Sequence, residues 1–284
     1  MKLAMLGLIV ALLIAPLARA DSPTWPLWDG KESRTEYGTR AHLAPTLTLD
    51  LGDGIKWEGV LIPAGSFTMG SPAGEAKTPK EAASEAQHKV TITKPFYMGK
   101  FEFTQAQYQK VMGANPSIEK GDDIGVHNVA VKDAEELCRK MSRLTGKDVR
   151  LPTEAQWEYA CRAGTTTPYY NGSTTADLDK IAWFGANSGG KPHPVGQKQP
   201  NPWGLYDMLG NIREFTADLY SDDAATGDSD PTGSQSGDPA NHTVRGAAYT
   251  ANAVAAGNMR AGSRRPTESL KSTGFRVIVT LPTR

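Results

Sequence analysis

Four residues near the C-terminal end of the chain carry side chains suited to gripping an anion and moving a proton. Arg260 and Arg264 offer guanidinium groups, which can bind a phenolate or a carboxylate through two parallel hydrogen bonds. Tyr249 and Glu268 can exchange a proton with a ligand if their surroundings tune their pKa values. The alternative is a solvated, charged rim around a loop region, and the spacing leaves both interpretations open.

The histidines and cysteines give little support for a metal or thiol centre. The five histidines occur singly, with no i,i+4 or His-x-His pair that would indicate a metal site: His42, His88, His127, His193 and His242. The simpler interpretation is that they are ordinary surface or loop residues. Cys138 and Cys161 are the two cysteines of the sequence. An even count in an exported protein favours a disulfide, whereas their apolar helix faces suit free, packed thiols. Both alternatives stay open.

Three helices and several short strands are expected to position these residues. Capping boxes mark the helix starts, and glycines mark their ends. The predicted helices are 105–112 (Thr104 and Gln107, ending at Gly113), 134–145 (Asp133 and Glu136, ending at Gly146) and one from Thr153 (with Gln156) to near Gly164. Alternating apolar residues predict strands around 60–62, 66–70, 90–92, 96–103 and 274–281. The 29 glycines and 19 prolines indicate a fold rich in turns.

The first twenty residues read as a cleaved export signal. Lys2 precedes an apolar run, and Ala18–Arg19–Ala20 fits a small-x-small cleavage site. The run is too short for a comfortable membrane span, so we expect no stable membrane insertion. The chain has 31 basic and 31 acidic residues, a balance that gives no electrostatic drive toward nucleic acid. An exported protein of the periplasm is the expectation.

Two sequence blocks carry a family resemblance. Arg150–Leu151–Pro152–Thr153–Glu154–Ala155–Gln156–Trp157–Glu158–Tyr159–Ala160 and Asn201–Pro202–Trp203–Gly204–Leu205–Tyr206–Asp207–Met208–Leu209–Gly210–Asn211 are similar to the signatures of the formylglycine-generating-enzyme (sulfatase-modifying factor) family. The resemblance spans about Gly59 to Leu281. It implies an α+β fold, a C-type lectin-like variant with much irregular structure. We therefore expect a signal peptide (1–20), an N-terminal extension (21–55) and a sulfatase-modifying-factor-like domain (56–284).

The resemblance also shows what this chain lacks. Family members that oxidise a sulfatase cysteine hold copper with two thiols, and those positions fall here on Ala251 and Ala256, with Ala248 in place of a serine. Alanine cannot bind copper(I), which needs soft sulfur ligands. The iron-dependent relatives need histidine ligands, which the scattered histidines do not supply. We therefore expect neither copper nor iron.

A structural calcium site is implied by the same resemblance. It places side-chain oxygens on Asp207 and Glu214 and backbone carbonyls on Gly210 and Ile212. Calcium takes six to eight hard oxygen ligands at flexible angles. The alternative is that Asp207 caps a turn and that Glu214 pairs with a neighbouring arginine.

In the family's cleft, the resemblance implies a changed set of polar groups. Arg213 stands where the family has a tryptophan. Arg213, Asn252, Arg260 and Arg264 are the expected substrate-binding residues, and Tyr249 and Glu268 are the expected catalytic ones.

One branch of the family combines a signal peptide with a cleft that lacks thiols. It matures the siderophore pyoverdine in the periplasm of pseudomonads, and this chain is similar to it. The resemblance implies oxidation of a peptide-linked dihydropyoverdine-type precursor, with molecular oxygen as oxidant and other periplasmic maturation proteins as candidate partners. The alternative is a non-enzymatic, lectin-like binding or scaffold protein, because a fold alone does not fix a function.

Overall fold

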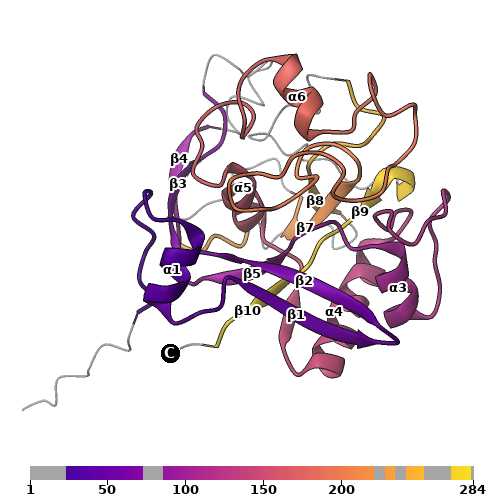
Figure 1. The fold of residues 1–284 in the computed structure, drawn as a ribbon, viewed down its shortest axis with the longest axis horizontal. Coiled ribbons are helices and arrows are strands. Elements are labelled where there is room, and N and C mark those ends of the chain that lie inside the picture. The colour runs from indigo at the N-terminus through magenta and orange to yellow at the C-terminus, as the bar shows by residue number, and fades with distance from the viewer. Residues whose placement is uncertain (1–23, 73–85, 221–227, 234–240, 253–269, 283–284) are drawn as a thin grey trace, which may run out of the picture.

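A computed structural model describes residues 24–72, 86–220, 228–233, 241–252 and 270–282 of the chain, and these form a mixture of helices and strands (Figure 1). The helices are α1 (Arg34–Ala41), α3 (Gln105–Met112), α4 (Val131–Thr145), α5 (Glu154–Arg162), α6 (Thr175–Ile181) and the 3-10 helix η1 (Leu270–Ser272). The strands are β1 (Thr46–Gly52), β2 (Ile55–Ile62), β3 (Gly65–Met69), β4 (His88–Ile92), β5 (Phe96–Gly99), β6 (Asp148–Arg150), β7 (Arg213–Leu219), β8 (His242–Arg245), β9 (Thr273–Gly274) and β10 (Ile278–Thr280). The predicted α+β class is confirmed.

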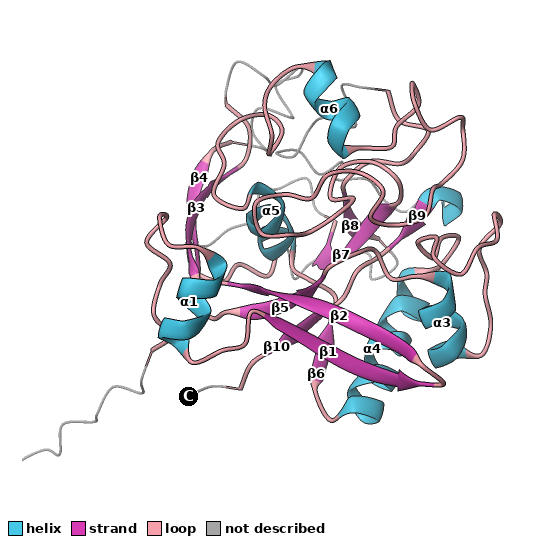
Figure 2. Ribbon diagram, in the orientation of Figure 1, coloured by secondary structure: helices cyan, strands magenta, loops and turns pink. Residues whose placement is uncertain are grey.

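An antiparallel five-stranded sheet crosses the lower half of the molecule in the order β1-β2-β5-β10-β6 (Figure 2). The last strand lies inside this sheet, because Val279 pairs with Tyr97 on one side and with Val149 on the other. Asp53 and Gly54 connect β1 to β2 with φ values of 52° and 78°, as a type I′ turn requires. The sheet therefore ties both ends of the described chain together.

Two further strand groups lie above this sheet: the β3-β4 hairpin and the three strands β8-β7-β9. The segment 274–281, expected as a single strand, instead contributes to two strands, β9 and β10, which belong to different sheets. Gly274 pairs with β7, whereas Ile278–Thr280 pairs with β5 and β6. Between the two strands lies Arg276, whose side chain is fully buried and pairs with Glu214. The strand expected over 96–103 likewise ends at Gly99.

The capping boxes of α3 and α5 are confirmed. In each helix the threonine hydroxyl accepts from the backbone N–H three residues on, and the glutamine side chain accepts from the threonine N–H. The box predicted at Asp133 is wrong: α4 begins at Val131, and its N-cap, Ala130, makes no side-chain cap. Asp133 instead lies in the first turn, where a carboxylate still favours the helix dipole.

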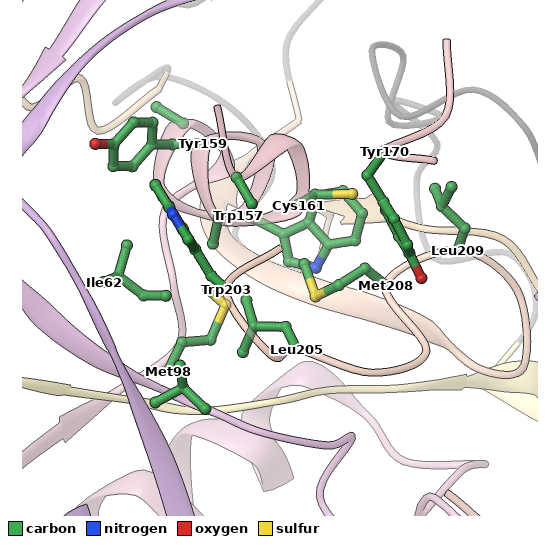
Figure 3. Packing of buried hydrophobic residues seen from close by; sticks show 14 of the residues in the cluster. Ile62, Met98, Trp157, Tyr159, Cys161, Tyr170, Trp203, Leu205, Met208 and Leu209 are labelled. Atoms are coloured by element: carbon green, nitrogen blue, oxygen red, sulfur yellow. The ribbon is translucent and has the colours of Figure 1, made fainter. Parts of the chain in front are cut away.

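The hydrophobic core has two parts, and each contains one of the cysteines. Cys161 on α5 packs with Trp157, Tyr170 and Met208 (Figure 3). Cys138 on α4 belongs to the second part. Both thiols are free and buried. Of the two alternatives, a disulfide or free thiols packed in the core, the structure therefore shows the second. Burial raises the pKa of Cys138 to about 12 and the pKa of Cys161 further still, so both remain protonated at neutral pH.

Residues 24–55, expected as an extension, contribute α1 and β1 to this architecture. Trp28 packs edge-on against Trp203, with ring centroids 5.3 Å apart, and its backbone N–H donates to the Ala64 carbonyl at 2.6 Å. The signal peptide predicted at 1–20 lies outside the described residues. A bilayer-spanning helix does not occur in the part of the chain that the structure describes.

Candidate functional site

The loop of residues 246–252, here called the cleft loop, is the described part of the region where the family resemblance locates the cleft. Three hydrogen bonds fix it. The Tyr249 N–H donates to the Asn211 carbonyl at 2.7 Å, and the Tyr249 carbonyl accepts from the Ser188 hydroxyl at 2.7 Å. The Gly185 N–H donates to the Ala251 carbonyl at 2.8 Å. A Cβ at Gly185 would lie 2.9 Å from that carbonyl oxygen, so the close approach requires glycine there.

Asn211 joins the cleft loop to the interior. Its φ of 55° is left-handed, a conformation that asparagine adopts more readily than most residues. Its side-chain amide donates to the Glu102 carboxylate at 2.6 Å, and its side-chain carbonyl accepts from the His193 N–H at 2.9 Å. Because the residue is fully buried, these bonds are protected from water. The loop therefore rests on a rigid polar junction.

The predicted cleft residues are partly placed by the structure. Tyr249 is 7% exposed and Asn252 is exposed on the same loop. Arg213 is half-buried at the start of β7, two residues beyond the Asn211 junction. Burial, with a smaller contribution from the charge of Glu119, raises the pKa of Tyr249, so its phenol is protonated at neutral pH. Tyr249 can therefore donate a hydrogen bond, although the raised pKa makes its phenol a weaker acid. Arg260, Arg264 and Glu268 lie outside the described residues.

The predicted calcium ligands lie in a buried cluster of acidic residues. Glu214 accepts from the Arg276 guanidinium at 2.6 and 2.7 Å and from the Trp157 indole at 2.7 Å. One oxygen of Asp207 accepts from the Gly196 N–H at 2.7 Å, whereas its Oδ1 is buried without a hydrogen-bond partner among the described residues. The arginine pairing considered as the alternative role of Glu214 is therefore present.

Electrostatics in this cluster are unbalanced. Three buried carboxyl groups, those of Glu102, Asp207 and Glu214, lie around the guanidinium of Arg276. Burial and the neighbouring carboxylates raise the pKa of Glu102 well above its usual range, and burial raises the pKa of Asp207 to about 6. A cation would relieve this excess, and Asp207 Oδ1 is an available oxygen ligand. The fit is partial, because both oxygens of Glu214 already accept hydrogen bonds, and the described residues hold no cluster of three His, Cys, Asp or Glu side chains arranged for a metal.

A second buried ion network surrounds α5. Glu158 accepts from Arg162 at 2.6 Å and from the Gly70 N–H at 2.9 Å, and Arg245 lies 3.0 Å from both Glu154 and Glu158. Beside it, Asp218 accepts from the Glu154 N–H at 2.6 Å at the start of the helix. Sequence reasoning did not identify Arg245, Asp218, Glu102 or Arg276.

This network predicts a pH-dependent stability. Burial and the charge of Glu154 raise the pKa of Asp218 from 3.8 to about 7. Between those values the folded protein binds the proton more tightly than the unfolded chain, so the free energy of unfolding falls as the pH rises. We expect Asp218→Asn to weaken that fall and to be more stable than the parent at pH 8, by an amount on the order of a few kcal/mol. Urea unfolding at pH 5 and pH 8 measures it, and parallel pH dependences in the two proteins would contradict it.

Comparison with known proteins identifies the family. Residues 56–281 match the sulfatase-modifying factor enzyme 1-like domain. Chaperone protein LppX of Paenibacillus barcinonensis is 32% identical over 212 residues, which cover 57% of this chain and 71% of that protein. Two solved structures, each 26% identical, share the fold. Treponema denticola variable protein 1 has a TM-score of 0.72 and covers 84% of this chain and 100% of its own. PvdO from Pseudomonas aeruginosa has a TM-score of 0.68 and covers 84% and 99%.

The predicted fold is thereby confirmed, and the two sequence blocks that suggested it lie inside the matched range. The first block runs from the last residue of β6 into α5, and the second carries the buried Asp207 and Asn211. The chain therefore belongs to the sulfatase-modifying factor enzyme 1-like family, the family of the formylglycine-generating enzymes.

Proposed function

We propose that this protein matures a pyoverdine-type siderophore in the periplasm by oxidising a peptide-linked dihydropyoverdine precursor. The observation that carries the proposal is a preserved family scaffold whose cleft loop holds Ala248 and Ala251 at positions where thiol-dependent members need serine and cysteine. The similarity to PvdO over 84% of the chain supports it. Other periplasmic maturation proteins are the proposed partners.

The proposed reaction balances without a protein-bound redox group. The reduced chromophore gives up two electrons and two protons, and dioxygen takes both to become hydrogen peroxide. An electron-rich catechol reacts with oxygen once it is deprotonated, so the protein would act by orienting the substrate and moving protons. Arg213, Asn252, Arg260 and Arg264 are the proposed binding groups, with Tyr249 and Glu268 as proton-transfer groups.

Turnover of the purified protein tests this function. Mixed with dihydropyoverdine under air, it should produce a fluorescent product that is two hydrogens lighter by mass spectrometry, at a rate above the protein-free reaction. A product that forms no faster than in the protein-free control would refute the proposal.

A binding function is the second candidate, and two observations favour it. The relative LppX is described as a chaperone protein. In addition, a groove of about 1260 Å³ opens between α4 and the β6–β10 edge, lined in part by Arg139, Arg143 and Arg150. A binder would raise its own melting temperature with ligand and leave the ligand chemically unchanged. Mass analysis after incubation distinguishes the two functions.

We also propose a structural calcium ion at Asp207, Gly210, Ile212 and Glu214. The unpartnered Oδ1 of Asp207 and the excess of buried negative charge support it. Calcium added to chelator-treated protein should raise the melting temperature, because it binds only the folded state. Asp207→Asn should abolish that increase, whereas Asp50→Asn, on the exposed face of β1, should keep it. An unchanged melting temperature with calcium would contradict the proposal.

A further inference from the structure

The loop that follows α3 is built as a rigid support. Gln105 accepts from the Asn115 amide at 2.8 Å and from the Gly121 N–H at 3.2 Å, and its own amide donates to the Glu119 carbonyl at 2.8 Å. The Lys120 ammonium donates to the Asn115 carbonyl at 2.8 Å. These bonds fix both arms of the loop, so the side chains at its tip are held in place.

That tip presents two side chains to the outside. Ile118 is 52% exposed, one of few large apolar side chains exposed among the described residues, and the Glu119 side chain is 39% exposed. The neighbouring Ser117 and His127 are buried. An exposed apolar side chain beside a carboxylate can contact a ligand that has an apolar ring and a hydroxyl group.

Behind Glu119 lies the fully buried imidazole of His127. Its Nε2 is 3.0 Å from the Glu119 carboxylate, and its Nδ1 is 3.1 Å from the Gly125 carbonyl. A carbonyl can only accept, so Nδ1 carries a proton. The Ile118 N–H lies 3.2 Å from Nε2, a contact that a neutral imidazole can accept.

This arrangement requires a shared proton. An unprotonated Nε2 and an ionised carboxylate both offer only lone pairs, and they would repel each other at 3.0 Å. A proton between them, on the carboxyl or on the imidazole, removes the repulsion. Glu119 and His127 therefore form a hydrogen-bonded pair, and the second carboxylate oxygen of Glu119 has no hydrogen-bond partner among the described residues.

The pair lies close to the predicted cleft. Val126, next to His127, contacts Gly274, and the adjoining Thr273 pairs with Arg213 across β9 and β7 (Figure 1). The charge of Glu119 is near enough to Tyr249 to contribute to its raised pKa. Arg213, Tyr249 and Glu119 thus approach one region from three separate segments of the chain.

We propose that Glu119 is a catalytic residue that exchanges a proton with the substrate hydroxyl, and that His127 is the positioning residue that shares that proton. The inference rests on the proposed oxidation. In one turnover the carboxylate takes a proton as the substrate O–H bond breaks. The electron pair of that bond stays on the substrate oxygen, and two electrons pass from the ring to dioxygen. Both protons lost by the substrate are transferred to the reduced dioxygen, which becomes hydrogen peroxide. One of these protons passes through the Glu119–His127 pair.

Two variants of Glu119 test this role with dihydropyoverdine under air. Glu119→Gln keeps the shape and removes the basic oxygen, so we expect kcat to fall about 100-fold with KM little changed. Glu119→Ala should be equally slow, and added formate should restore part of its rate, because formate supplies a carboxylate to the exposed position. A purely structural glutamate would show no such rescue.

The outcomes separate the two proposals. Glu58→Gln, at an exposed carboxylate paired with Lys100, is the matched control and should retain the parental rate. An active parent with an equally active Glu119→Gln would overturn the role of Glu119 alone. An inactive parent would overturn the proposed oxidation, and the inference that rests on it would fall as well.

Discussion

Arg276→Met is expected to unfold the protein under conditions where the parent is stable. The guanidinium makes a bidentate pair with Glu214 and also donates to the Gly99 carbonyl at 3.0 Å and the Tyr206 carbonyl at 2.9 Å. Removing it leaves Glu214 without its ion-pair partner, in a cluster that also holds the buried carboxyl groups of Glu102 and Asp207. Breaking one buried pair typically costs about 3–5 kcal/mol, and we expect a loss at the upper end.

Urea unfolding monitored by tryptophan fluorescence measures this loss. Arg276→Lys keeps the charge but not the fork geometry, so it should lose less. Arg139→Met removes an exposed arginine paired with Glu136 on α4, and it should change the free energy of unfolding by less than about 0.5 kcal/mol. An Arg276→Met protein as stable as the Arg139→Met control would show that the acidic cluster does not depend on this arginine.

Gly274→Ala is expected to have the second large effect. A Cβ at this position would overlap the Val126 carbonyl oxygen and lie 3.0 Å from an Ile212 methyl group. Backbone cannot retreat as a flexible side chain can, so β9 must move away from the segment that carries His127. We expect a loss of about 3 kcal/mol, the upper range for overpacking a core.

The control for this substitution is Gly121→Ala, whose Cβ would meet side-chain atoms of Ile124 and Asp123 and no backbone atom among its nearest neighbours. It should cost clearly less. Thermal unfolding of both variants gives the comparison, and equal losses would contradict the claim that the Gly274 contact is rigid.

The sequence predicted correctly those features that depend on interactions between residues close together in the chain. The threonine–glutamine boxes at α3 and α5 formed as expected, because their partners lie three residues apart. Asp133 is not the N-cap because α4 begins two residues earlier, at Val131. The point at which the preceding loop turns into the helix decides this start, and the local sequence does not reveal it. The division of β9 from β10 was also missed, and Arg276 between them pairs with a glutamate 62 residues away.

The buried charged residues around α5 are the part of the structure that the sequence analysis missed most. Glu154, Glu158 and Arg162 on α5 look like a solvated helix face, yet all three are buried by contacts with distant segments. Arg245 completes that network from β8. The spacing of Glu158 and Arg162, four residues apart, was the one signal available. Burial, which turns a weak surface pair into a structural one, is a property of the assembled fold.

The position of His127 beside Glu119 likewise could not be predicted from the sequence. A single histidine in a loop gives no metal or catalytic pattern, and an ordinary loop residue was the simpler interpretation. The fold places its ring against Glu119, eight residues earlier, and close to the segment of β9 that pairs with Arg213. Ala248 and Ala251, by contrast, could be recognised from the sequence, because the family resemblance assigns a serine and a cysteine to those positions.

The most direct test of the account is oxidation of dihydropyoverdine by protein from which copper and iron have been removed, with calcium retained and air supplied. We predict the same rate before and after the removal, with hydrogen peroxide formed in step with product. A rate that disappears on removal and returns with copper or iron alone would contradict the central claim that this cleft works through proton transfer without a redox metal.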